Sequence, residues 1–535
     1  MKKTLFRNWP LYAAIATFLV VMWLAINVSL RQNKGHLVYA SDDNYIAMAV
    51  ARNFAQYGVF GVTRYGFTSS SSTLLWTLLL SLTYFLGAAE QLAPLGWNLA
   101  FAMLVLVAAY AVLSWYRISA TVSFVALLSI VLLLPLPALV LAGMEHTLQT
   151  LLSILTVFLG ARLISGEAPG CARRDAVWLL LLAPAVTATR FEGMFLIATL
   201  CGLFLLRKRW RFALGLGVGG SLPVVIHGII SVSHGWFWFP ASVLLKASLP
   251  DSHSGAGFFL SIVNPIFVNV RQSPHELVLL VAVLLVYILA DGKGSGAGES
   301  RQVMGAVLAV LWVSQLEFVG GGSMYRYDAC LCGLTILWLA VQLPVIAPSL
   351  SLWSWATWRV PKNLAAAALA LALFFPLAYK GGELLWFLPQ CTTNIFEQQY
   401  QMGLFVREYY QGSAVALNDI GAVDYLADIH CVDLMGLAIP EVAAARRKDS
   451  FHTQEMQNLA KQTGARIAIV YDEWFPGLLP SEWIRVGRWT IRKNVIAAKD
   501  TVSFYAINPG EAEHLVESLR DFSSQLPADV IQRGP

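Results

Sequence analysis

The sequence has little charge for its length. Only 13% of its 535 residues are charged and 57% are hydrophobic, whereas about 25% of the residues of a soluble domain are charged. This excludes an ordinary soluble globule and predicts an integral membrane protein. Of the 32 carboxylates, 13 lie in residues 1–382 and 19 lie in residues 383–535. We therefore predict a multi-helix membrane domain over 1–382 and a soluble domain over 383–535.

The sequence also lacks the motifs of nucleotide-driven chemistry. It contains neither a Walker motif nor a GxGxxG motif, so nothing indicates ATP-driven transport. No basic run with interleaved aromatic residues indicates nucleic-acid binding. The six cysteines form no CxxC pattern. Cys391 and Cys431 both lie in the C-terminal domain, where they either form a disulfide in an oxidising compartment or remain buried thiols.

Apolar runs are present along most of the first domain. The first, Trp9–Val28, is long enough to cross a bilayer and has no nearby cleavage site, which predicts an uncleaved helix. We expect 11 to 13 membrane helices, with the run at 72–88 re-entrant or flat at the interface and 176–206 forming a hairpin. Basic or flexible links between the runs are expected in the cytoplasm, because Lys and Arg are biased to that side. These links are 115–119, 161–175, 207–211, 291–301 and 354–362.

With these links inside, polar sequences gather on the opposite, outer face. The first of them lies in a predicted outer loop, residues 30–71. Ionisable side chains at membrane depth are costly and usually mark a site. The segments are SDDNY (41–45), AGMEHT (142–147), ATRFEG (188–193), HGWFWFPASVLLKA (234–247) and GGGSMYRYD (320–328). We therefore expect a functional site on the outer face.

Asp42 and Asp43 precede a predicted amphipathic helix in this outer loop. They either cap that helix, whose N-terminus favours negative charge, or act as a general base or a metal ligand where water meets lipid. Adjacent side chains point in different directions, so only one is expected to take a proton. Asp42 is slightly favoured because it lies nearer the loop. Any ion would be Mg²⁺, Mn²⁺ or Ca²⁺ bound through this pair.

The other polar side chains of the outer face suit an anionic ligand. Arg190 and Glu192 lie at a predicted turn, where they form a structural ion pair, or where Arg190 contacts a phosphate while the acids orient it. Arginine favours bidentate phosphate contact. The candidate substrate-binding residues in the membrane domain are Glu145, Arg190, Glu192, His234, Lys246, Tyr325, Arg326 and Asp328.

The C-terminal region has a different pattern. Short β-branched and apolar runs at 414–420, 465–472 and 501–507 predict strands, and 395–410 and 438–463 have helical periodicity. These elements predict a small α/β domain. Its segment NDIGAVDYLAD (418–428) is typical of a strand end followed by a turn and a helix start.

Several sequence blocks follow one another along the chain. They are the acidic pair, RYGFTSSSSTLLWTLLLSL (64–82), GMEHTLQTLL (143–152), TRFEG (189–193), FPASVLLKA (239–247), YRYD (325–328) and NDIGAVDYLADIHCVDLMGLAIPE (418–441). The order of these blocks resembles the GT-C glycosyltransferases and is most similar to the branch that contains the mycobacterial terminal arabinofuranosyltransferase. Two departures stand out: Phe191 occupies the position of a common proline, and FPASVLLKA replaces a more polar run.

The resemblance implies an enzyme of the bacterial inner membrane, with its active site and C-terminal domain on the periplasmic face. It would move a sugar, such as a pentofuranose, from a polyprenyl-phosphate donor to an envelope glycan, glycolipid or glycoprotein, with inversion. Asp42 or Asp43 would be the base, and Asp419 and Asp433 would help to shape the acceptor site. Residues expected to contact the lipid phosphate are Arg190, Lys246 and Arg326.

Two alternatives belong to other classes. A transporter or flippase of a lipid-linked precursor should show internal repeats and polar residues near the membrane midplane, and the sequence shows neither. A non-catalytic envelope-assembly protein should tolerate substitution of both acids. For the enzyme, a polyprenyl-phosphate donor carries its own leaving group, so no cofactor is required beyond the divalent cation considered above.

Overall fold

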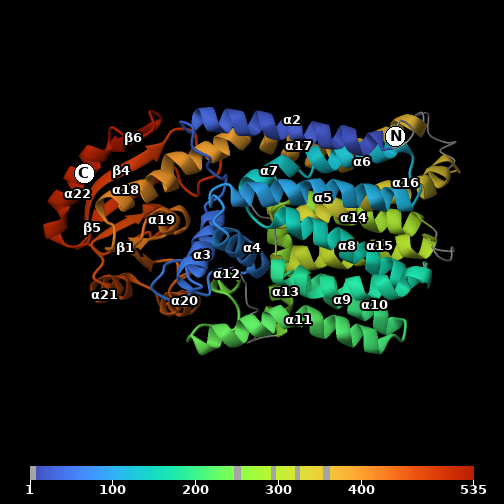
Figure 1. Cartoon of the computed structure of the whole chain (residues 1–535), viewed down its shortest axis with the longest axis horizontal. Coiled ribbons are helices and arrows are strands. Elements are labelled where there is room, and N and C mark those ends of the chain that lie inside the picture. The colour runs from blue at the N-terminus through green and yellow to red at the C-terminus, as the bar shows by residue number, and fades with distance from the viewer. Residues whose placement is uncertain are drawn as a thin grey trace.

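The computed structural model describes residues 8–167, 169–245, 255–290, 297–319, 324, 326–352 and 362–534. A long helical bundle carries an α/β domain at one end, and the N-terminus lies at the other end (Figure 1). Lys246 and Tyr325 are not among the described residues, so the predictions for these two side chains lie outside the described structure. The expected fold class, a polytopic helical membrane domain with a C-terminal α/β domain, is confirmed.

The bundle consists of helices that mostly run along its long axis (Figure 1). Their bounds are α2 (Trp9–Gln32), α5 (Ala93–Trp115), α6 (Ala120–Leu132), α7 (Leu136–Ala142), α8 (His146–Ser165), α9 (Ala172–Thr189), α10 (Gly193–Leu206), α11 (Trp210–Ser233), α12 (Ala241–Leu244), α13 (Gly255–Gln272), α14 (Pro274–Leu289), α15 (Ala297–Ser314), α16 (Ala329–Leu352) and α17 (Lys362–Ile395). Helix α8 lies at the centre and is buried along most of its length, because it packs against α5, α9, α15 and α16.

Seven helices of the described chain are long and apolar enough to cross a membrane, or eight if the pair α13 and α14, bent by 104°, forms one span. This number is lower than the 11 to 13 expected from apolar runs. The difference arises because some runs form shorter helices, such as α4 (Leu74–Phe85, 12 residues) and α10 (14 residues). Helix α4 is too short to span a bilayer, as expected for 72–88.

Two predicted local features, a hairpin turn and an amphipathic helix, are present in the structure. Helices α9 and α10 form a hairpin that breaks at Arg190–Glu192. A β-carbon on Gly193 would lie 2.8 Å from the carbonyl oxygen of Val186, so glycine permits this tight turn. The predicted amphipathic helix is α3 (Asp43–Tyr57), which packs along α4 between the bundle and the C-terminal domain (Figure 1).

The C-terminal domain contains a six-stranded sheet in the order β2-β1-β3-β5-β4-β6. Strand β1 is parallel to β2 and β3, and β5, β4 and β6 continue the sheet in antiparallel pairs. The strands are β1 (Ala414–Leu417), β2 (His430–Asp433), β3 (Ile467–Val470), β4 (Ile484–Ile491), β5 (Thr501–Ala506) and β6 (Val530–Arg533). The helices are α18 (Gln401–Tyr409), α19 (Gly421–Leu426), α20 (Pro440–Arg447), α21 (Thr453–Thr463) and α22 (Ala512–Phe522).

The three predicted strands correspond to β1, β3 and β5, whose residues are nearly all buried. Helix α17 continues across residue 383, the predicted domain boundary, and leads through a π-helical turn at Phe396–Tyr400 into α18. Cys391 lies in α17 and Cys431 lies in β2, and both are free thiols, so the possible disulfide is not formed.

Candidate functional site

The two neighbouring acids of the outer loop point to different parts of the molecule. The carboxylate of Asp42 is buried against the C-terminal domain, where its oxygens accept hydrogen bonds from the backbone N–H groups of Gly421 (3.0 Å) and Ala422 (2.8 Å). These groups begin α19, so Asp42 caps a helix of the other domain. A β-carbon on Gly421 would lie 2.2 Å from the carbonyl oxygen of Asp42, which requires glycine at this contact.

Helix α3 contacts α19 at both ends. Asp42 precedes α3 and caps the N-terminus of α19, while the guanidinium of Arg52 donates to the carbonyl oxygens of Asp424 and Tyr425 at the C-terminal end of α19. A negative group at the start of a helix and a positive group at its end both suit the helix dipole. The predicted cap of α3 by the side chain of Asp42 is not formed, because this carboxylate caps α19 instead.

Asp43, one residue later, faces the bundle. Its carboxylate accepts a hydrogen bond from Nη1 of Arg326 at 2.6 Å, and the same nitrogen donates to Ser41 Oγ at 3.0 Å. The side chain of Asp43 is 43% exposed, whereas that of Arg326 is 11% exposed. Asp43 is thus the member of the pair that can meet a ligand.

The backbone before Asp43 is fixed from the bundle side. Ala40 donates its N–H to the carbonyl oxygen of Leu141 at 2.8 Å, at the end of α7. Gly143 follows α7 with a φ of 75°, and a β-carbon there would lie 2.5 Å from Nδ2 of Asn44. Glycine at 143 therefore allows the α7–α8 connection to pack directly beneath the start of α3.

Arg190 is held by two carboxylates at the break between α9 and α10. Its Nη1 lies 2.7 Å from Oε1 of Glu145, and its Nη2 lies 2.8 Å from Oε1 of Glu192. The ring of Tyr327 lies between two cations, with its centroid 4.9 Å from Cζ of Arg190 and 5.6 Å from Cζ of Arg326. The ion pair with Glu192 is formed, and Glu145 adds a second one.

A cavity of about 530 Å³ opens beside these residues. Its polar lining residues are Asp43, Glu145, Arg190 and Glu192 together with the hydroxyl run Ser70–Thr73, and Leu437 from the loop after β2 also lines it. Its other lining residues are mainly apolar and include Phe191, Met194, Phe195, Phe239, Val243, Phe318 and Val319. The cavity is therefore amphipathic, because acids and a guanidinium line it together with aromatic and aliphatic side chains.

Other predicted residues lie outside this cavity lining. His234 is exposed, stacks on Phe67 at 4.4 Å and bonds through Nδ1 to the carbonyl oxygen of Ile230, 2.8 Å away. Asp328 is buried and lies 2.6 Å from Nε2 of His275, which anchors the segment that carries Arg326. Sequence reasoning did not single out Leu437, although it lies in a block that it quoted.

Asp419 follows β1 and lies next to the acidic pair. Its Oδ2 accepts hydrogen bonds from Gln399 (2.8 Å) and from the hydroxyl of Tyr471 (2.9 Å). Burial raises the pKa of Asp419, although these two bonds oppose the shift. Burial also raises the pKa of Asp42 well above its usual value, and the charges of Asp419 and Asp43 add to this effect, against the two backbone N–H bonds.

Because the pKa values of Asp42 and Asp419 are raised in the fold, we expect the fold to become less stable as the pH rises. In the unfolded chain Asp42 and Asp419 ionise near pH 3.8, whereas in the fold they hold a proton to higher pH, so stability decreases above pH 3.8 until the raised pKa values are passed. Asp419→Asn keeps an acceptor for Gln399 and Tyr471 and removes one charge. We expect it to flatten the decrease in melting temperature between pH 5 and pH 8. An unchanged slope would contradict the contribution of the raised pKa of Asp419 to this pH dependence.

Comparisons with known proteins agree with this architecture. The chain matches the crystal structure of ArnT from Cupriavidus metallidurans bound to undecaprenyl phosphate, with a TM-score of 0.53 and 14% identity over 94% of this chain and 99% of that one. The apo state of the same protein matches with a TM-score of 0.52 and 15% identity over 95% of this chain and 99% of that one. An Archaeoglobus fulgidus oligosaccharyltransferase matches with a TM-score of 0.44 and 11% identity over 96% of this chain and 74% of that one. The fold of the chain is thus the GT-C fold.

The sequence comparisons are less informative. Residues 393–505, from the end of α17 to β5, match a family described as a domain of unknown function, DUF8728. A search of curated proteins finds no significant match.

Proposed function

We propose that this GT-C-fold chain is a membrane glycosyltransferase that moves a sugar from a polyprenyl-phosphate donor to an acceptor hydroxyl. The amphipathic cavity carries the proposal, because its apolar and aromatic lining residues suit an isoprenoid chain and its charged and hydroxyl lining residues suit a phosphate and a sugar. The structural likeness to a protein crystallised with undecaprenyl phosphate supports this donor class.

Asp43 is the general base in this proposal. Its exposed carboxylate lines the cavity, whereas both oxygens of Asp42 are occupied by N–H groups of α19. Asp43 takes the proton of the acceptor hydroxyl as the acceptor oxygen bonds to the anomeric carbon. The bond from that carbon to the phosphate oxygen breaks, and the polyprenyl phosphate leaves with the electron pair. Attack opposite the leaving group inverts the anomeric centre.

Arg326 serves the donor phosphate. In the structure its guanidinium is paired with Asp43 at 2.6 Å, and a base held in such a pair is a weak proton acceptor because the cation stabilises its ionised form. The phosphate competes for the same guanidinium, so donor binding frees Asp43. The charge of Arg190 is already balanced by two carboxylates. In this proposal Arg190 therefore holds Glu145 and Glu192 in place beside the cavity and does not bind the phosphate.

Substitution of Arg326 should affect donor binding more than turnover. Arg326→Gln removes a charge-assisted contact to phosphate, and we expect KM for the polyprenyl-phosphate sugar to rise roughly tenfold to a hundredfold, in line with about 1.5–3 kcal/mol for a hydrogen bond to a charged group. Arg326→Lys should restore part of the affinity. Steady-state kinetics with varied donor measure both. A fall in kcat at unchanged KM would contradict the role.

The charges of the site leave a place for one more cation. Asp43, Glu145 and Glu192 are opposed by Arg190 and Arg326, which leaves one negative charge before the donor phosphate enters. Mg²⁺, Mn²⁺ or Ca²⁺ fits here, because Asp43 offers an exposed carboxylate and such ions bind through one or two carboxylates plus substrate phosphates. We expect a chelator to lower transfer and the added cation to restore it. Full activity in chelator would exclude this role for a cation.

The proposed setting is the bacterial inner membrane, with the cavity on the periplasmic face and an envelope glycan, glycolipid or glycoprotein as acceptor. A pentofuranose is the sugar that the resemblance to the mycobacterial branch favours. The deciding experiment uses purified protein in detergent with a radiolabelled polyprenyl-phosphate pentose and envelope acceptors. Transfer of label without a sealed membrane supports the enzyme. Movement of the donor across vesicles without transfer would instead support a flippase.

A further inference from the structure

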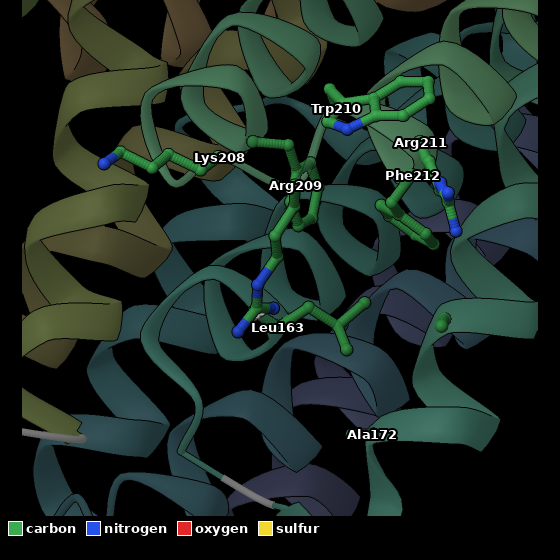
Figure 2. Close-up of a pocket in the computed structure, with 9 residues that line it drawn as sticks. Leu163, Ala172, Lys208, Arg209, Trp210, Arg211 and Phe212 are labelled. Carbon is green, nitrogen blue, oxygen red and sulfur yellow. Dashed lines mark hydrogen bonds between the residues drawn. The ribbon is translucent and has the colours of Figure 1, made fainter.

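A second cavity, of about 380 Å³, lies at the end of the bundle far from the candidate site. It is lined by Leu163, Ala172, Ala176, Phe204, Lys208, Arg209, Trp210, Arg211 and Phe212. In Figure 2 the side chain of Arg209 reaches toward Leu163, Trp210 and Arg211 lie beside Phe212, and Lys208 extends to the other side. Five consecutive basic or aromatic residues, Lys208–Phe212, at the start of α11 thus line one hollow.

Two helices place this cavity in the leaflet opposite the candidate site. Helix α8 begins after Glu145 and reaches the second cavity at Leu163, while α9 begins there with Ala172 and ends before Arg190. At 1.5 Å per residue, each path of 18 residues is about 27 Å long. This distance is close to the roughly 30 Å thickness of a bilayer hydrocarbon core.

The basic side chains of this end outnumber the acids that could balance them. Glu299 pairs with Arg207, and Asp175 is buried in a pair with Arg162. Among the described residues, Lys208 and Arg211 form no ion pair, and both are exposed. The second cavity therefore presents uncompensated positive charge at the level of the lipid head groups.

The rest of the lining is apolar. Leu163, Phe204 and Phe212 form the wall toward the bundle, and two alanines of α9 leave the space open. Arg209 is fixed by a hydrogen bond from Nη1 to the carbonyl oxygen of Leu163, at 2.6 Å. Cations at the rim and an apolar interior match a molecule with an anionic head and a hydrocarbon chain.

We infer that this second cavity binds an anionic phospholipid of the leaflet opposite the candidate site, with its head group attracted by the positive charge of Lys208 on one side of the rim and of Arg211 on the other, and an acyl chain against Leu163, Phe204 and Phe212. The positive-inside bias of the basic links makes this the cytoplasmic leaflet. The binding is independent of any sugar transfer, because the two cavities lie on opposite sides of the membrane.

The test measures binding of labelled phosphatidylglycerol to the purified full-length chain in a neutral detergent. We expect saturable binding that unlabelled phosphatidylglycerol displaces and that phosphatidylcholine or inorganic phosphate does not. The double variant Lys208→Gln with Arg211→Gln should weaken binding roughly thirty-fold, which is about 2 kcal/mol, or about 1 kcal/mol for each cation. Ala172→Leu, which fills the apolar space and keeps the charges, should also weaken it.

The matched control is Arg117→Gln with Arg173→Gln, which removes two exposed arginines from the same end of the bundle but outside the cavity lining. We expect this variant to bind phosphatidylglycerol as the unmodified chain does. An equal loss in both double variants would overturn the inference in favour of a general charge effect. Displacement by inorganic phosphate alone would overturn it in favour of a site for a soluble anion.

Discussion

Asp43→Asn is expected to abolish sugar transfer while the protein still folds and reaches the membrane. The amide keeps the size of the side chain and an oxygen that can accept the hydrogen bond from Arg326, but it cannot take a proton from an acceptor hydroxyl. General-base catalysis typically contributes a factor of about 10² to 10⁴ in rate. Initial rates of label transfer from the polyprenyl-phosphate sugar measure the loss.

The control for Asp43→Asn is Asp43→Glu, which keeps the base and displaces it by one methylene. We expect partial activity from this variant and an unchanged melting temperature from both. Transfer at the unmodified rate by Asp43→Asn would exclude Asp43 as the base. If both Asp variants of the pair were fully active, the non-catalytic assembly protein would become the better account of the chain.

Asp42→Ala is expected to weaken the attachment of the C-terminal domain to the membrane domain, because Asp42 bonds to α19. It leaves the N–H groups of Gly421 and Ala422 without a partner at a buried contact. Each unsatisfied group costs about 1–3 kcal/mol, and relief of the buried carboxyl offsets part of this. We expect a net loss of about 2–3 kcal/mol, read as faster proteolysis at the junction of the two domains and a lower melting temperature.

Asp428→Asn is the matched control for the attachment. It breaks the contact of Asp428 with Arg64, which also joins the outer loop to the C-terminal domain but is exposed. Exposed ion pairs contribute about 0–1 kcal/mol, so proteolysis should change little. A stable Asp42→Ala variant without transfer activity would reverse the assignment and make Asp42 the base.

The sequence predicts the elements of this fold better than it predicts the contacts between them. The amphipathic α3, the hairpin at Arg190 and the buried strands β1, β3 and β5 follow from local periodicity and turn residues. The strands β2, β4 and β6 have exposed or partly exposed residues that weaken such a pattern. Helix α17 crosses the predicted boundary because charge composition changes before the helix ends.

The roles of Asp42 and Asp43 illustrate what local sequence cannot supply. Both acids precede the same helix, and the preference for Asp42 rested on its place in the chain. Its partner, Gly421, lies 379 residues away, and only the packing of α19 against α3 assigns the two carboxylates to different tasks. The association of Arg190 with Glu145 likewise joins two blocks 45 residues apart, at adjacent helix ends.

The cap that Asp42 places on α19 has a consequence for biosynthesis. A ribosome makes the chain from its N-terminus, so the outer loop is released long before Gly421 exists. Until α19 docks, the backbone of Asp43, whose Cα lies about 3.8 Å from that of Asp42, lacks one of its two supports. We therefore expect the segment that carries Asp43, the base of the proposed reaction, to reach its final order only after the C-terminal domain has been translated and has docked.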